Sequence, residues 1–88
     1  MSVSHHEIAT ALELARAYGG GLKLRENGFW NGRTQPANDA RLVSRRVVEE
    51  LARRGSLEFA DFRENPRTGN PVPMRAALTG AGGEARRD

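Results

Sequence analysis

The stretch that decides the fold is residues 40–57, which read ARLVSRRVVEELARRGSL. Apolar residues at three- and four-residue spacing predict a helix over Arg45–Arg54. The buried side of this helix consists of Val47, Val48 and Leu51. Ser44 precedes the helix as an N-cap residue, because its hydroxyl can accept a hydrogen bond from a backbone N–H of the first turn. Gly55 follows the last turn and ends the helix.

The segment before Ser44 allows two interpretations. In the first, Thr34–Leu42 forms a short helix, with Thr34 as its N-cap and Pro36 in the first turn, where a missing N–H costs nothing. In the second, one continuous helix spans Asp39–Arg54. We favour the break, because a serine hydroxyl prefers a capping position to the middle of a helix.

A further helix is predicted near the N-terminus, over Ser4–Tyr18. Ser4 and Glu7 form the S-x-x-E capping box, in which each side chain satisfies a backbone N–H of the other residue. One apolar stripe at helical spacing contains Ile8, Ala11, Leu12, Ala15 and Tyr18. The glycines over 19–21 end the helix, so the first interpretation above gives three helices in all.

A short hairpin follows, in which Leu22–Arg25 pairs with Phe29–Asn31. The turn is Asn27–Gly28, a favoured pair for a tight turn in which both residues have positive φ. Two aromatic residues, Phe29 and Trp30, lie at the start of the second strand. Either they pack into the core beneath the loop, or they form an exposed patch for a protein partner, where tryptophan is a favoured anchor.

A second hairpin is predicted towards the C-terminus. Ser56–Phe62 forms one strand and Val72–Leu78 the return strand, with a turn-rich loop between them. The side chains predicted to point inward from the return strand are Val72, Met74, Ala76 and Leu78. Pro73 cannot donate to a strand ladder, so this strand is expected at an edge of the sheet.

The chain is short enough for one domain, with 88 residues. We place this domain at residues 1–80 and a flexible C-terminal tail at 81–88. The absence of cysteine excludes disulfides and thiolate zinc sites. No apolar run approaches the roughly 18 residues of a membrane span, and the N-terminus lacks the regions of a secretory signal. We therefore expect a cytoplasmic protein with no membrane partner.

Basic residues outnumber acidic ones by 14 to 11, and Lys23 is the only lysine among them. The surplus of positive charge lies in the middle of the chain, over residues 21–54. A high-GC genome would produce the same preference for arginine. A local basic surplus nevertheless indicates a polyanion or an acidic protein surface as the partner.

Residues 40–57 resemble the helix-turn-helix core of the winged helix-turn-helix family, in which an apolar residue and a serine occupy the turn. The family's L-x-x-x-G-x-L run into the first wing strand is matched by Leu51, Gly55 and Leu57. The stretch over 75–82, RAALTGAG, resembles the L-T-x-x-G pattern that closes the wing. The resemblance covers about residues 34–82. It implies an α+β, winged-helix-like fold with three helices, a small antiparallel sheet and a wing hairpin.

The resemblance also implies a function, that of a small transcriptional regulator which binds double-stranded DNA. The 45–54 helix would enter the major groove, and the 63–71 wing would contact the flanking backbone. Arginine suits both contacts, because its planar fork pairs bidentately with guanine and with phosphate. The candidate nucleic-acid-binding residues are Arg41, Arg45, Arg46, Arg53, Arg63 and Arg67. The competing interpretation is a solvated helix face on which arginines pair with Glu49 and Glu50.

Two other kinds of partner stay open. Regulators of this type often act as homodimers, since one short helix reads few base pairs, and the first helix and the C-terminal strand are candidate dimer surfaces. The alternative function is a protein-binding module on the same scaffold, of the kind that phages and mobile elements use to inhibit host machinery such as CRISPR effector complexes. Its protein-interface candidates are Phe29 and Trp30.

Enzyme chemistry is not indicated by any motif. His5 and His6 are adjacent and point about 100° apart on a helix, so they do not form a metal pair. No Ser, His and Asp set is recognisable. The glycines over 19–21 follow a helix instead of preceding one, which is the wrong order for a phosphate-binding loop. We expect no enzymatic activity and no cofactor.

Overall fold

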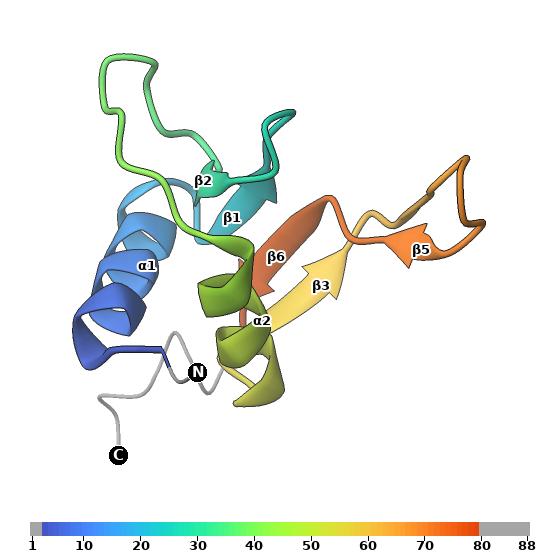
Figure 1. Cartoon of the computed structure of the whole chain (residues 1–88). Coiled ribbons are helices and arrows are strands. Elements are labelled where there is room, and N and C mark those ends of the chain that lie inside the picture. The colour runs from blue at the N-terminus through green and yellow to red at the C-terminus, as the bar shows by residue number, and fades with distance from the viewer. Residues whose placement is uncertain (1–2, 80–88) are drawn as a thin grey trace.

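This computed structural model describes residues 3–79, which form two helices and a small antiparallel sheet (Figure 1). The helices are α1 (His5–Ala17) and α2 (Arg45–Arg53). The main sheet contains β1 (Gly21–Leu24), β2 (Trp30–Gly32), β3 (Leu57–Ala60) and β6 (Arg75–Leu78). A two-stranded sheet contains β4 (Arg63–Glu64) and β5 (Pro71–Val72). The predicted α+β class is confirmed. The expectation of three helices is wrong for the described residues, and the predicted tail at 81–88 lies outside them.

The main sheet has the strand order β2-β1-β6-β3, with every strand antiparallel to its neighbours. The last strand, β6, lies between β1 and β3. The expectation from Pro73 that this strand lies at an edge of the sheet is therefore wrong. Pro73 avoids the ladder because it falls in the break between β5 and β6. Residues opposite each other share a face, so Leu22 and Ala76 point to the same side of the sheet. Both helices pack on that side (Figure 1).

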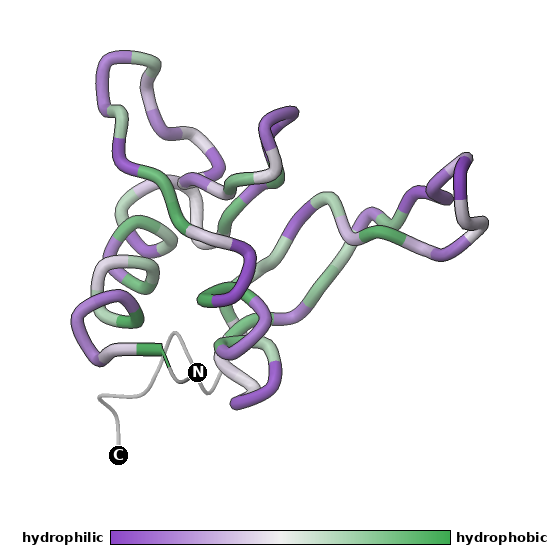
Figure 2. The backbone as a smooth tube through the Cα atoms, in the orientation of Figure 1, coloured by the Kyte–Doolittle hydropathy of each residue, from purple (hydrophilic) through white to green (hydrophobic). Residues whose placement is uncertain are grey.

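One apolar core joins the helices to the sheet. Its buried residues are Ile8, Ala11, Leu14, Ala15, Leu22, Trp30, Val43, Val47, Val48, Leu51, Leu57 and Ala76. Figure 2 shows hydrophilic residues at the tips of both hairpins, away from this core. Among residues 3–79, no helix is long and apolar enough to cross a membrane.

The predicted capping box is present at the start of α1 and is confirmed. The Ser4 hydroxyl accepts a hydrogen bond from the Glu7 N–H at 3.1 Å, and the Glu7 carboxylate accepts one from the Ser4 N–H at 3.1 Å. Every residue of the predicted stripe lies in or against the core, although Leu12 and Tyr18 are only partly buried. The prediction lacked Leu14, which is fully buried. The helix therefore faces the core slightly differently from the stripe that the spacing suggested.

The first hairpin is confirmed, with Leu24 opposite Trp30. Its turn differs from the prediction, because only Gly28 of the Asn-Gly pair has a positive φ, of 87°. The Gly28 N–H donates to the Arg25 carbonyl at 3.0 Å, and the Arg25 N–H donates to the Phe29 carbonyl at 2.8 Å. The loop therefore has three residues with a left-handed glycine at its end, which is the next most common hairpin connection.

The predicted helix over Thr34–Leu42 is wrong, and so is the alternative of a continuous helix over Asp39–Arg54. This segment is irregular and is held by the nearly buried side chain of Gln35. The Gln35 amide nitrogen donates to the carbonyl oxygens of Asp39 and Arg41, both at 2.8 Å. Its amide oxygen accepts the N–H of Gly32 at 2.7 Å. These tertiary bonds outweigh a weak local helix propensity.

The irregular segment ends in a β-bridge between Val43 and Trp30. Each backbone N–H donates to the other residue's carbonyl oxygen, at 2.7 and 2.8 Å. Together with the Gln35 contact to Gly32, the bridge covers the outer edge of β2. An uncovered edge would present unpaired donors and acceptors to other chains, so this cover blocks edge-to-edge pairing at β2.

The break before α2 is confirmed. Ser44 has an extended backbone, with φ −75° and ψ 155°, and its hydroxyl accepts the N–H of Val47 at 3.4 Å. The helix begins at Arg45 and ends at Arg53, one residue earlier than predicted. The predicted buried side, formed by Val47, Val48 and Leu51, is buried.

The second hairpin is also confirmed, although it is bent. Leu57 lies opposite Leu78 in the main sheet, and Arg63 lies opposite Val72 in the two-stranded extension. Between the two parts, Asp61 has a φ of 55°, the only positive value among the non-glycine residues of 3–79. The extension therefore projects from the main sheet as a separate arm beyond β3 (Figure 1).

Candidate nucleic-acid interface

The outer surface of α2 is positively charged. Because valine and leucine side chains face the core, the charged residues of this helix are left on its solvent side, and Arg45, Arg46 and Arg53 are all exposed. The helix also presents its amino end and the associated partial positive charge at Arg45. The predicted outward direction of these arginines is confirmed.

Most of these arginines pair with acidic residues of the same helix. Arg45 Nε donates to a Glu49 carboxylate oxygen at 2.8 Å, and both side chains are more than half exposed. Arg53 and Arg54 both bind the carboxylate of Glu50. Arg53, followed by Arg54, lowers the pKa of the Glu50 carboxyl below its usual value. The exposed i,i+4 pair of Arg45 with Glu49 is worth only about 0.3–0.5 kcal/mol, so an incoming phosphate could replace it. The Glu50 side chain is only 17% exposed, so Arg53 and Arg54 are held more firmly.

Arg46 differs from its neighbours. Within residues 3–79, no hydrogen bond or ion pair involves its guanidinium group, and the side chain is exposed. It lies in the first turn of α2, directly after the Ser44 cap and Arg45. The helix dipole repels a cation at this point, and a bound anion would reduce this repulsion.

Arg41 is engaged in a network that holds the irregular segment. Its guanidinium donates to both carboxylate oxygens of Asp39, and the Tyr18 hydroxyl donates to the same carboxylate at 2.8 Å. Arg41, and then Tyr18, hold the pKa of the Asp39 carboxyl well below its usual range. The hydrogen bond to Asp39 raises the pKa of the Tyr18 hydroxyl. Arg41 is therefore a structural residue that joins this segment to α1.

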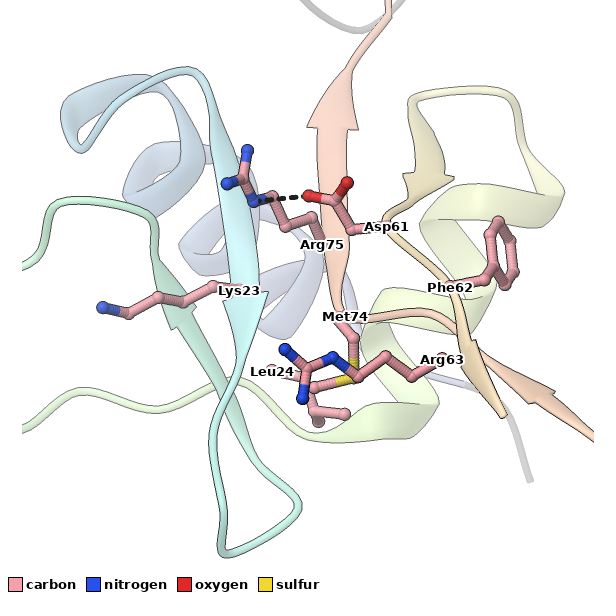
Figure 3. A pocket seen from close by; sticks show the side chains of 7 residues that line it. All are labelled: Lys23, Leu24, Asp61, Phe62, Arg63, Met74 and Arg75. Atoms are coloured by element: carbon pink, nitrogen blue, oxygen red, sulfur yellow. Dashed lines mark ion pairs between the residues drawn. The ribbon is translucent and has the colours of Figure 1, made fainter. Parts of the chain in front are cut away.

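The two arginines of the arm, Arg63 and Arg67, lie in different places. Arg67 lies in the turn between β4 and β5, where the Asn65 side chain accepts its backbone N–H at 2.9 Å. Its side chain is exposed and, in the described part of the chain, makes no hydrogen bond or ion pair. Arg63 instead lines a groove on the main sheet, beside Leu24 and Met74 (Figure 3). The structure therefore does not bring Arg63 together with the arginines of α2.

The two aromatic interface candidates, Phe29 and Trp30, differ in their exposure to solvent. Trp30 is 3% exposed, and its ring centroid lies 6.1 Å from that of Phe59, so the interpretation of Trp30 as an exposed interface residue is wrong. Phe29 is 43% exposed, which agrees with the interface interpretation. It lies beside Leu42, which is 41% exposed, in a groove of about 350 Å³ that also contains Val47.

Two features of this surface were not found from the sequence. Leu42 is the last residue of a predicted helix that does not form, so its exposure was missed. The groove around Arg63 also includes Lys23 and Arg75, which lie far apart in the chain. The alternation in Leu22–Leu24 does indicate that Lys23 faces away from the core, but it does not reveal which strand lies beside it.

In comparisons with known proteins, no family model, no curated protein and no solved structure matches this chain. Its function is therefore inferred from the chain's own residues.

Proposed function

We propose that this protein is a DNA-binding module of the winged-helix type, which contacts duplex DNA with α2 and with the arm formed by β4 and β5. Three features support the type: the short helix that follows a Ser44 cap, the exposed outer side of that helix, and the long hairpin directly after it. The missing helix before Ser44 is a departure from the pattern. An irregular segment takes its place and still fixes the start of α2.

The observation that carries the proposal is the unpaired, exposed guanidinium of Arg46 at the amino end of α2, which has no partner within residues 3–79. A helix that enters the major groove uses its first turns to reach base edges and phosphates. Arg45 lies beside Arg46 in a weak surface pair with Glu49, which a phosphate can displace. The proposed interface therefore has one arginine, Arg46, that is unpaired among residues 3–79, and beside it Arg45, whose pair with Glu49 a phosphate can replace.

The arm supplies the second contact. Arg67 lies in its turn, away from the main sheet, and has no side-chain partner among the described residues. A backbone contact at this point would position the protein without reading sequence. Base readout would then come from α2 alone.

The test is fluorescence anisotropy of a labelled random-sequence duplex at low salt. We expect binding by the wild-type protein and weaker binding by Arg46→Gln, because this variant loses a cation that contacts a phosphate or a base edge. Arg67→Gln should weaken binding equally across sequences. The matched control is Lys23→Gln, which removes one exposed charge from the opposite face of the sheet. Equal losses in Arg46→Gln and Lys23→Gln would contradict the proposal, because general charge alone would then account for both.

A second candidate function, a protein-binding module, is supported by the exposed pair Phe29 and Leu42. Both side chains line the same groove, and exposed apolar side chains gathered in one place are typical of protein contact sites. The test is affinity capture from nuclease-treated host lysate with the wild-type protein and with Phe29→Ser. A partner that survives nuclease and is lost with Phe29→Ser favours this function over DNA binding.

A further inference from the structure

The open face of the main sheet carries a groove that includes Arg63 of β4 but none of the arginines of α2. It has a volume of about 430 Å³ and lies between β1 and the bend that joins β3 to β4. Figure 3 shows the charged side chains of this groove in front of the sheet and both helices behind it. The lining residues are Lys23, Leu24, Asp61, Phe62, Arg63, Met74 and Arg75. A ligand in this groove would face away from α2.

The groove carries more positive than negative charge. Three of its lining residues are cations, Lys23, Arg63 and Arg75, and one is an anion, Asp61. Arg75 Nε lies 2.8 Å from a carboxylate oxygen of Asp61. Lys23 and Arg63 are exposed, and neither forms an ion pair within residues 3–79. Lys23 and Arg75 are opposite each other on β1 and β6, which fixes them on the same face.

The bend at Asp61 brings the charged side chains of the groove together. Its backbone is held in the left-handed region, at φ 55°, which costs an L-residue energy, although aspartate tolerates it better than most residues. Strained positions of this kind concentrate at functional sites. The bend turns the chain so that Arg63 lies over Met74 and Leu24, while the Asp61 carboxylate occupies one side of Arg75 (Figure 3). Asp61 thus stands where an external carboxylate could bind.

The groove also has an apolar part. Leu24 and Met74 lie together beneath the Arg63 guanidinium, and methionine adapts its shape to a bound side chain (Figure 3). Phe62 is 54% exposed, but its ring stands apart from the other lining residues. Among these lining residues, no aromatic ring therefore faces the centre of the groove, as stacking of nucleic-acid bases would require. The lining suits carboxylates next to an aliphatic side chain.

We propose that this groove binds an acidic segment of a partner protein. Carboxylates of the segment would pair with Lys23, Arg63 and Arg75, and an aliphatic side chain between them would cover Met74. Arginine forks bind carboxylates bidentately, which gives such a contact direction as well as charge. Because the groove and α2 lie on opposite sides of the sheet, a partner protein and DNA could be held together. The site does not depend on the DNA-binding proposal.

The test uses two synthetic peptides as probes, EEDLEED and its neutral counterpart QQNLQQN, titrated into the ¹⁵N-labelled full chain. We expect the acidic peptide to shift the backbone amide signals of Lys23, Asp61, Arg63 and Arg75. The double variant Lys23→Gln, Arg63→Gln should weaken binding roughly tenfold, as the loss of two charged contacts requires. Asp61→Asn should tighten binding, because it frees Arg75 and still tolerates the left-handed backbone.

A control variant distinguishes this groove from the basic surface of α2. Arg46→Gln removes one exposed arginine from α2 and should leave peptide affinity unchanged, whereas it should weaken DNA binding. The proposal is overturned if the neutral peptide binds equally well, if the shifted signals lie on α2, or if Asp61→Asn weakens binding. It is also overturned if inorganic phosphate at the same ionic strength displaces the peptide and produces the same shifts, since the site would then be a phosphate site.

Discussion

Replacement of Gln35 by alanine should cost the fold about 2–4 kcal/mol. The side chain is 8% exposed and makes three hydrogen bonds, one from the N–H of Gly32 and two to the carbonyl oxygens of Asp39 and Arg41. The N–H of Gly32 is buried, so its loss of a partner costs about 1–3 kcal/mol. The two carbonyls lie in an accessible segment, where water replaces part of their bonds, and each adds about 0.5 kcal/mol or slightly more.

The assay is urea unfolding followed by the fluorescence of Trp30, the single tryptophan, which lies in the core next to the affected edge. With an m value of about 1–1.5 kcal/mol/M, the midpoint should fall by about 2 M. Gln35→Glu provides a matched comparison, because it keeps the acceptor for Gly32 but places a carboxylate oxygen against the two carbonyls. It should be as destabilising as alanine at pH 7. A loss below about 0.5 kcal/mol in Gln35→Ala would refute the claim that this amide holds the segment.

Three further perturbations test other contacts. Gly32→Ala would place its Cβ atom 2.5 Å from the Cβ of Tyr18, so we expect a loss of about 1–3 kcal/mol and a lower melting temperature by calorimetry. Ser44→Ala should cost about 0.5–1 kcal/mol in urea unfolding, towards the low end because the bond from Val47 is long. The pKa of Asp39 is lowered in the folded state, so its ionised form stabilises the fold above the unfolded pKa of about 4, and this contribution fades as pH falls. Asp39→Asn should therefore be less stable than wild type at pH 7, with a smaller difference at pH 3; a constant difference would contradict this account.

Local signals predicted the helices and hairpins that form. The capping box at Ser4, the cap at Ser44 and the strand alternation all act within a few residues, and the structure contains each element that they predict. The prediction for the segment before Ser44 was wrong because the structure of this segment depends on contacts with residues distant in the sequence. Gln35 and Val43 bond to β2, and Trp30 could be matched to Val43 only after the strand order was known.

The candidate interface was likewise predicted only where its residues depend on local sequence. Helical spacing predicted that Arg45 and Arg46 face solvent, because the buried side of the same helix is apolar. It could not predict that Arg41 is engaged, since this depends on an Asp39 carboxylate held by Tyr18, 21 residues away in sequence. The groove beside Arg63 depends on the placement of β6 next to β1, which no local pattern encodes.

The salt dependence of duplex binding tests the central claim most directly. Affinity of the wild type and of the double variant Arg46→Gln, Arg67→Gln would be measured by anisotropy between about 50 and 200 mM salt. The slope of log K against log salt is negative, and each lost phosphate contact reduces its magnitude by about 0.9. If both residues bind phosphate, the magnitude of the slope should be about 1.8 smaller in the double variant than in the wild type. An unchanged slope, or no binding by the wild type at the lowest salt, would contradict the assignment of α2 and the arm as a DNA interface.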